Sequence, residues 1–322
     1  MRFALMSEPQ QGLSYVELLA LARTAEEAGF ETFMRSDHYT SFPGDALAPT
    51  TDAWTTLSGI ARETSRIRLG VLVSPVTFRV PGAFFKQVMT VDEMSGGRVE
   101  VGLGAGWNER EHAQHGIRYP DVRERMDMLE EELEIFTGFW DKPDGWSFDG
   151  AHWQVRDAHI RPKDRSGWGS PDGRRRPHLL MGGSGKPRSL RLAARYADEY
   201  NMSSSPADAC KIAFEQLAVE CRAGGRDPDS VTRSVMAGAV VGRDENEVRS
   251  RVRDLLVMTG EQTESPDGWL AARRSRWIIG TPDQAREQAA AFEAAGAERL
   301  MLQTLIPRDL DHVRLLGEVF SS

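Results

Sequence analysis

The sequence predicts an α/β fold, a single (β/α)8 TIM barrel that occupies residues 1–322. Short apolar runs alternate with amphipathic helical patterns along the whole chain, which is typical of a parallel sheet covered by helices. There are eight such runs, the number of strands that closes a barrel of this kind. The length of 322 residues and the 40% hydrophobic content suit one large barrel.

The predicted strands are short and mostly apolar, as expected for barrel strands that are buried on both faces. In chain order they are RFALM (2–6), ETFMR (31–35), IRLGVLV (67–73), RVEVGL (98–103), HLLM (178–181), EYNM (199–202), SVMAGAVV (234–241) and RLMLQTL (299–305).

The helices predicted between these strands carry start and stop signals. Ser14 and Glu17 form a capping box before LLALARTAEEA, and Gly29 follows the end of that helix. Pro81 opens the helix AFFKQVMTVDEM, where a missing N–H costs nothing. A further helix is expected over residues 281–295, so the alternation of strand and helix continues to the end of the chain.

Two irregular stretches interrupt the alternation, at about residues 141–177 and 258–277. The first is rich in Gly, Pro, Asp and Arg. Long loops in a compact domain are usually lids or binding loops. We therefore expect two barrel insertions rather than a second domain, and we expect them to form the substrate side of the site.

Composition and charge narrow the class of protein. The net charge of −8 argues against a nucleic-acid binder, and no apolar run is long enough to span a membrane. Without a signal-peptide pattern, a cytoplasmic location is expected. Cys210 and Cys221 share one helical pattern and would lie about 16 Å apart, so both are expected to be reduced thiols.

Small and polar residues follow several of the predicted strands, and in such barrels the active site lies at these strand ends. The segments are SDHY (36–39), SP (74–75), GAGWN (104–108), GGSG (182–185) and SSS (203–205). His38, next to Asp37, offers an imidazole that could act as an acid or base near neutral pH. A loop-packing role for this pair is the alternative.

The segment GGSGKPRSL predicts an anion site. Flexible residues precede a helix that begins near Pro187, and Lys186 and Arg188 lie in its first turn. Free N–H groups, the helix dipole and two cations would together bind a phosphate. A simple tight turn is the alternative.

The residues present argue against two other interpretations. The run VEVGLGAGWN resembles a dinucleotide-binding fingerprint, but Trp107 occupies the position where a third glycine is needed. His112 and His115 are not accompanied by further ligands at a recognised metal-site spacing, so no metal site is expected.

The series SDHY, LGVLVSPVTFR, MSGGRVEVGLGAGWNEREH and LLMGGSGKPRSLRLAARYADEYN resembles the bacterial luciferase-like monooxygenase superfamily. It is most similar to an actinobacterial branch of oxidoreductases that use the deazaflavin coenzyme F420. The resemblance spans nearly the whole chain. It implies hydride transfer between F420 and a small organic substrate, in a homodimer. An FMNH2-dependent monooxygenase and a non-enzymatic flavin-binding or deazaflavin-binding barrel are the alternatives.

The resemblance also implies roles for individual residues. Asp37 and His38 would lie at the deazaflavin ring as catalytic residues, and a non-proline cis peptide between Leu72 and Val73 would support the ring. The remaining residues implied to bind the cofactor are Asn108, Met181, Gly182, Gly183 and Ser184.

One position departs from the family pattern. Trp107 stands where the sugar-phosphate dehydrogenases of this superfamily have a catalytic glutamate. This difference argues against that substrate and leaves His38 as the best candidate for proton transfer.

Overall fold

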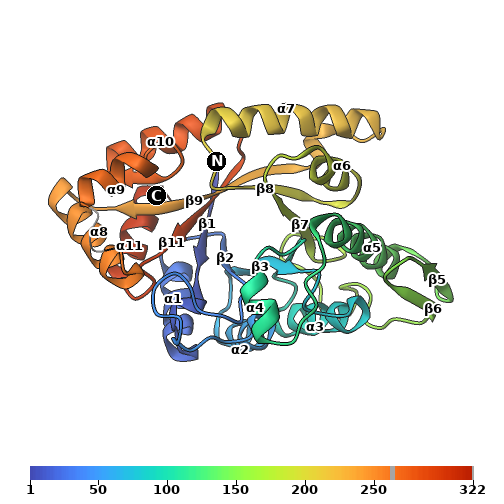
Figure 1. The fold of residues 1–322 in the computed structure, drawn as a ribbon. Helices are drawn as coiled ribbons and strands as arrows, with labels where there is room; N and C mark the ends of the chain where they lie inside the picture. The colour runs from blue at the N-terminus through green and yellow to red at the C-terminus, as the bar shows by residue number, and fades with distance from the viewer. Residues whose placement is uncertain (262–264, 321–322) are drawn as a thin grey trace.

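The barrel of the computed structural model, which describes residues 1–261 and 265–320, closes through eight parallel strands. Neighbouring strands pair in parallel, and the pairing of β8 with β9 completes the ring (Figure 1). All eight predicted strands are confirmed, and the short β10 (Ile278–Gly280) extends the sheet beside β9. The barrel strands are β1 (Arg2–Ser7), β2 (Thr32–Arg35), β3 (Arg68–Pro75), β4 (Val99–Gly104), β7 (His178–Gly183), β8 (Glu199–Ser203), β9 (Thr232–Val241) and β11 (Arg299–Thr304).

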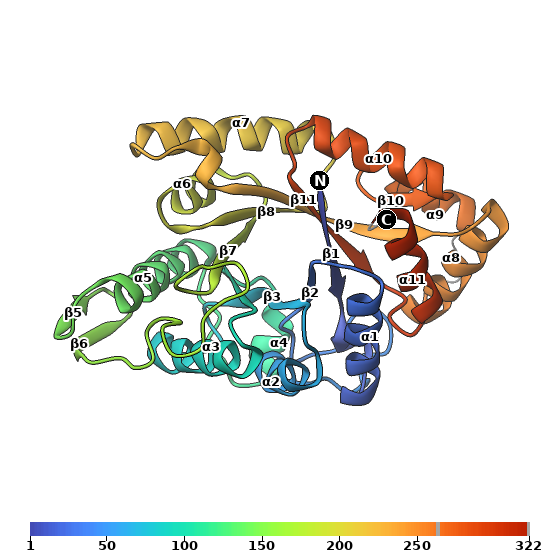
Figure 2. The ribbon, with the colours of Figure 1, turned by 180° about the vertical axis from the view of Figure 1, so that it is seen from behind.

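Helices cover the outside of the barrel, as Figures 1 and 2 show from opposite sides. The predicted capping box is confirmed, because Ser14 N donates to Glu17 Oε2 at 2.8 Å. Among the described residues, no helix is both long and apolar enough to cross a membrane. The covering helices are α1 (Tyr15–Glu27), α2 (Ala53–Glu63), α3 (Pro81–Ser95), α5 (Val122–Asp141), α6 (Pro187–Tyr196), α7 (Ala207–Ala223), α8 (Glu245–Thr259), α10 (Pro282–Ala294) and α11 (Leu310–Phe320).

The main hydrophobic core lies between the strands and these helices. Trp54 of α2 and Phe84 of α3 pack edge to face, with ring centroids 5.4 Å apart. Both rings are buried, and each contributes on the order of 1.5–3 kcal/mol through removal from water. Cys210 and Cys221 are free and buried, as predicted, and burial raises the pKa of the Cys210 thiol to about 12.

A buried cluster of charges closes the end of the barrel where the strands begin. Arg299 Nη1 lies 2.8 Å from Glu100 Oε2 and 3.0 Å from Glu199 Oε2. Arg68 also pairs with Glu100, at 2.7 Å. Burial raises the pKa of Glu100, but the guanidinium groups of Arg299 and Arg68 hold it well below its usual range. The barrel interior is therefore sealed by ion pairs at this end.

The first insertion lies at this same end, so its predicted place on the substrate side is wrong. Residues 141–177 contain an antiparallel hairpin, β5 (Trp146–Asp149) and β6 (Gln154–Ala158), which extends beyond the end of α5 (Figure 2). Arg165 joins the insertion to Asp92 of α3 through a 2.7 Å ion pair. A segment that follows a helix and precedes a strand must lie where the strands begin, away from the active-site end.

The second insertion lies at the opposite end, where the strands finish. Within residues 258–277, α9 (Pro266–Arg273) leads to β10, which runs beside the last residues of β9. Trp277 Nε1 donates to Ser204 Oγ at 3.1 Å, just beyond the end of β8. Residues 262–264 of this insertion lie outside the described residues.

Candidate active site

A cavity of about 650 Å³ opens at the carboxyl ends of the barrel strands. All eight barrel strands or the residues directly after them contribute to its lining, together with α5 and α6. Its volume is typical of a site for a small molecule or cofactor. Neither the first insertion nor the described part of the second contributes a lining residue, so the substrate side is built from the strand ends themselves.

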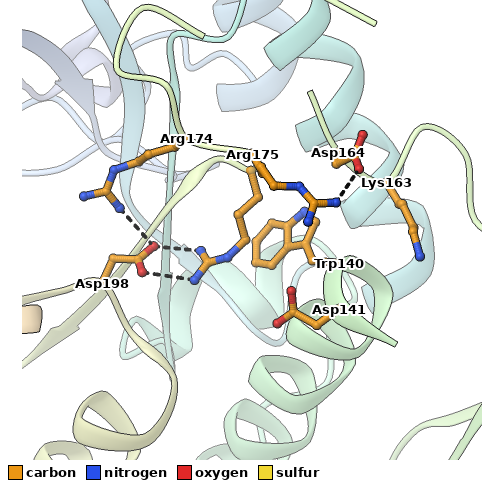
Figure 3. A pocket seen from close by; sticks show the side chains of 8 residues that line it. Trp140, Asp141, Lys163, Asp164, Arg174, Arg175 and Asp198 are labelled. Atoms are coloured by element: carbon orange, nitrogen blue, oxygen red, sulfur yellow. Dashed lines mark hydrogen bonds and ion pairs between the residues drawn. The ribbon is translucent and has the colours of Figure 1, made fainter. Parts of the chain in front are cut away.

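A smaller pocket, of about 260 Å³, lies at the other end of the barrel (Figure 3). Its arginines are already paired with carboxylates, and Lys163 donates to the carbonyl oxygen of Lys142 at 3.1 Å. Arg175 reaches Asp164 at 3.0 Å, and Arg176 binds Asp198 through two hydrogen bonds of 2.7 and 3.0 Å. These pairs describe a structural cluster, and the chemistry is better sought in the larger cavity.

His38 lines the larger cavity and is held by a buried carboxylate. Its Nδ1 donates to Glu111 Oε1 at 2.9 Å, and the backbone N–H of Tyr39 donates to Glu111 Oε2 at 3.1 Å. The rings of Phe42 and Trp107 pack edge-on against the imidazole. With Nδ1 engaged, Nε2 is the ring nitrogen left to exchange a proton.

Asp37 does not lie in the cavity, in contrast to its implied contact with the cofactor. Its fully buried carboxylate binds Arg79, which also binds Asp52 at 2.8 Å and Tyr39 Oη at 3.0 Å. Burial lowers the pKa of Arg79, but the charges of Asp37 and Asp52 raise it by more. The pKa therefore lies above its usual value, and the guanidinium stays charged. Asp37 therefore positions the loop that carries His38.

Asn108 is also absent from the cavity lining. It precedes α4 (Glu109–Gln114), and its carbonyl oxygen accepts from His112 Nδ1 at 2.7 Å. The other ring nitrogen of His112 lies 2.7 Å from Thr77 Oγ1, so both nitrogens serve the fold. In the described ranges, no group of three His, Cys, Asp or Glu side chains has a geometry that could hold a metal ion.

One wall of the cavity is formed by β3 with its neighbours. The peptide bond between Leu72 and Val73 is cis, as the resemblance implies, and both residues line the cavity. A Cβ atom on Gly104 or Gly182 would lie only 2.5 or 3.0 Å from a methyl carbon of Val73. These glycines therefore make room for the Val73 side chain, and the wall facing the cavity is apolar with exposed backbone.

The GGSG segment forms the edge of the cavity beside α6. Met181, Gly182, Gly183 and Ser184 all line it. Tyr200 Oη, on the neighbouring strand β8, accepts from the Gly185 N–H at 2.9 Å and so holds the turn between β7 and α6 in place. A Cβ on Gly183 would lie 2.9 Å from the Tyr200 ring carbon Cζ, so this glycine is required by packing as well as by any ligand.

The two cations of the adjacent helix start are not equivalent. Arg188 Nη2 lies 2.5 Å from Asp127 and 3.0 Å from Glu130, so its charge is balanced within the fold. Lys186 is exposed and also lines the cavity. The phosphate interpretation therefore rests on Lys186, the loop N–H groups and the start of α6.

Sequence reasoning missed Glu111, the partner of His38. The residue belongs to the charged run after β4, which indicates a place near the rim. It lies 73 positions from His38, and no spacing rule connects the two. Only the closing of the barrel brings the carboxylate to the imidazole.

Comparison with known proteins identifies the family. A family model described as luciferase-like monooxygenase matches residues 1–299. The chain belongs to the luciferase-like monooxygenase family. Its fold agrees with this assignment, because the structure of an F420-dependent secondary alcohol dehydrogenase in complex with an F420-acetone adduct superposes with a TM-score of 0.82, at 18% identity, over 99% of this chain and 98% of that one.

Curated luciferase-like relatives use two kinds of cofactor. The F420-dependent glucose-6-phosphate dehydrogenase of Microbacterium testaceum is 27% identical over 94% of this chain and 91% of its own length. The FMNH(2)-dependent dimethylsulfone monooxygenase of Pseudomonas putida is 23% identical over 87% of this chain and 80% of its own length. Members of the family with named activities are thus oxidoreductases, of the dehydrogenase or the monooxygenase type.

A third relative has no assigned activity. The protein Rv0953c of Mycobacterium tuberculosis, described as uncharacterized, is 32% identical over 56% of this chain. The match spans 64% of that relative's length.

Proposed function

We propose that this chain is an F420-dependent oxidoreductase that transfers a hydride between coenzyme F420 and a small organic substrate. The observation that carries the proposal is one cavity that joins the His38–Glu111 pair to the loop around Gly183 and Lys186. The similarity to an F420-dependent dehydrogenase over 94% of the chain supports F420 over FMN.

The residues present fit a deazaflavin with a phosphate-bearing side chain. Leu72, Val73 and Met181 provide an apolar wall for a flat ring. The close approach of Gly182 to this wall leaves no side chain between a ligand and the backbone. The loop before α6 and the charge of Lys186 would hold the phosphate.

The chain's own contribution to the chemistry is proton transfer and positioning. F420, when bound, supplies the site that accepts or donates the hydride. When an alcohol is oxidised, the hydroxyl proton passes to His38 Nε2, and in the reverse direction the same nitrogen returns it. Glu111 holds the imidazole with its proton on Nδ1 and stabilises the imidazolium that forms. Trp107 and Phe42 limit the access of water to this ring.

Cofactor choice is tested by thermal unfolding. We expect oxidised F420 to raise the melting temperature more than FMN does at equal concentration, because a ligand at a hundred times its Kd adds about 2.7 kcal/mol to the free energy of unfolding. If FMN raises the melting temperature and F420 leaves it unchanged, the chain is a monooxygenase of the FMNH2-dependent type.

The phosphate site is tested at Lys186, because a substitution at Gly183 would disturb its packing on Tyr200. Lys186→Ala is expected to raise the Kd of F420 about tenfold, measured by fluorescence titration, since one charged contact is lost. The deazaflavin nucleoside without phosphate should bind this variant and the parent equally. Arg195→Ala, which removes an exposed charge from the last turn of the same helix, is the matched control. Equal losses for both ligands would assign the loop a purely structural role.

The homodimer and the cytoplasmic location implied at the level of sequence stay predictions. A carrier without catalytic activity is the alternative to an enzyme, and it would bind F420 without any dependence of turnover on His38.

A further inference from the structure

A carboxylate lies in the cavity on the side away from the loop around Gly183. Glu8 follows β1, lines the cavity and is 7% exposed. Its Oε1 accepts from Gln303 Nε2 and its Oε2 accepts from Gln10 Nε2, both at 2.5 Å. Each carboxylate oxygen is therefore fixed by one amide donor, and the second lone pair of each oxygen is left to accept from another group.

The two amides are themselves held by the strands. Gln303 belongs to β11, and Gln10 accepts from Ser36 Oγ, just after β2, at 2.6 Å. Gln10, Gln303 and Ser36 all line the cavity with Glu8. The network thus spans three adjacent strands. It holds the carboxylate of Glu8 in a fixed orientation before a substrate binds.

Gln11 gives an independent indication that a ligand binds here. It lines the cavity and is only 6% exposed, yet neither its amide nitrogen nor its amide oxygen has a hydrogen-bond partner among the residues that the structure describes. A buried amide without partners is destabilising and rare. One donor and one acceptor beside Glu8 are therefore available to a molecule in the cavity.

The hydrogen-bond partners of Glu8 are both neutral amides. The buried Arg35, outside the lining, attracts Glu8 but is shared with Asp37 and Asp52, and these three carboxylates face only two cations, Arg35 and Arg79, so one negative charge is not balanced. Of the other ionised groups in the lining, Glu111 already engages His38, and Arg188 engages Asp127 and Glu130. Lys186 lies with the loop before α6, across the barrel from β1 and β11. A second negative charge placed beside Glu8 would be repelled.

We propose that Glu8 and Gln11 form the substrate subsite, and that it selects a neutral or cationic substrate with a hydroxyl or amine group. A substrate that carries a carboxylate or phosphate at this position is rejected. The inference rests on the proposed function in one respect, because it assumes that the loop before α6 holds the cofactor and leaves this side to the substrate.

Three cyclohexane probes that differ in one group test the subsite. They are cyclohexane-1,4-diol, 4-aminocyclohexanol and 4-hydroxycyclohexanecarboxylate. Binding is measured by thermal shift, with and without F420, so a failure of F420 to bind is seen separately from a failure of the probes. We expect the diol and the amino alcohol to bind the parent protein at least about tenfold more tightly than the hydroxy acid does.

Two variants separate charge from hydrogen bonding. In Glu8→Gln, the diol should bind no more than about threefold more tightly than the hydroxy acid, and the Kd of F420 should be unchanged. Gln11→Leu should lower the affinity for the diol about fivefold and keep the preference for the diol over the hydroxy acid. The melting temperature of this variant should equal or exceed that of the parent, because the substitution removes an unpaired buried amide. Glu215→Gln, the same charge change at an exposed position on α7, is the control and should resemble the parent.

Either of two results overturns the proposal. One is a parent protein that binds the hydroxy acid as tightly as the diol. The other is a Glu8→Gln variant that keeps the full discrimination between them.

Discussion

His38→Ala is expected to lower turnover by roughly 10²–10⁴-fold, the usual contribution of a positioned general acid or base. The imidazole lies in the cavity, with Nδ1 bound to the buried Glu111 at 2.9 Å, so its removal leaves no group in the same place to carry the proton. The measurement is the steady-state rate of F420 reduction or oxidation with a substrate that the parent protein turns over. Cofactor affinity should fall much less, because the wall at Val73 and the loop at Gly183 are untouched.

Two further variants sharpen this test. Glu111→Gln should lower turnover by less than His38→Ala does, because the amide can still bond to the ring but no longer stabilises its positive charge. His159→Ala, which removes an exposed imidazole from the first insertion, should leave turnover unchanged. If His38→Ala turns over at the parent rate with F420 bound, proton transfer by His38 is refuted.

Arg299→Met is expected to lower the free energy of unfolding by about 3–5 kcal/mol, since it removes the guanidinium that two buried carboxylates share and leaves Arg68 alone to balance Glu100. Arg299 is 1% exposed and holds both Glu100 and Glu199 at the start of the barrel. Denaturant unfolding at neutral pH measures the change. Arg286→Met, at an exposed ion pair on α10, is the control and should change stability by no more than about 0.5 kcal/mol.

The same cluster predicts how stability depends on pH. Because the folded protein holds the pKa of Glu100 below its unfolded value, the ion pair contributes fully above the unfolded pKa and its contribution is lost as pH falls below it. The parent protein should therefore lose stability below about pH 4.5, whereas the Arg299→Met variant should lose less over the same range. Equal acid dependence in both proteins would contradict a stabilising role for the cluster.

The sequence by itself determined the fold and the end of the barrel where the site lies. An apolar run such as IRLGVLV indicates a strand that is buried on both faces, and a cap such as Ser14 with Glu17 indicates the start of a helix. Each element can therefore be predicted from its own residues. Placing His38 and the loop around Gly183 at one rim then needed only the rule that parallel strands end together.

Only the tertiary structure decided which side chains meet. Asp37 and His38 are adjacent in sequence, yet one binds Arg79 outside the cavity and the other faces into it. Glu111 lies 73 positions from His38, and Gln303 lies 295 positions from Glu8. Periodicity reports the local backbone and its burial. The pairing of polar groups depends on how the closed barrel aligns the ends of its strands. This alignment cannot be predicted from any single segment of the chain.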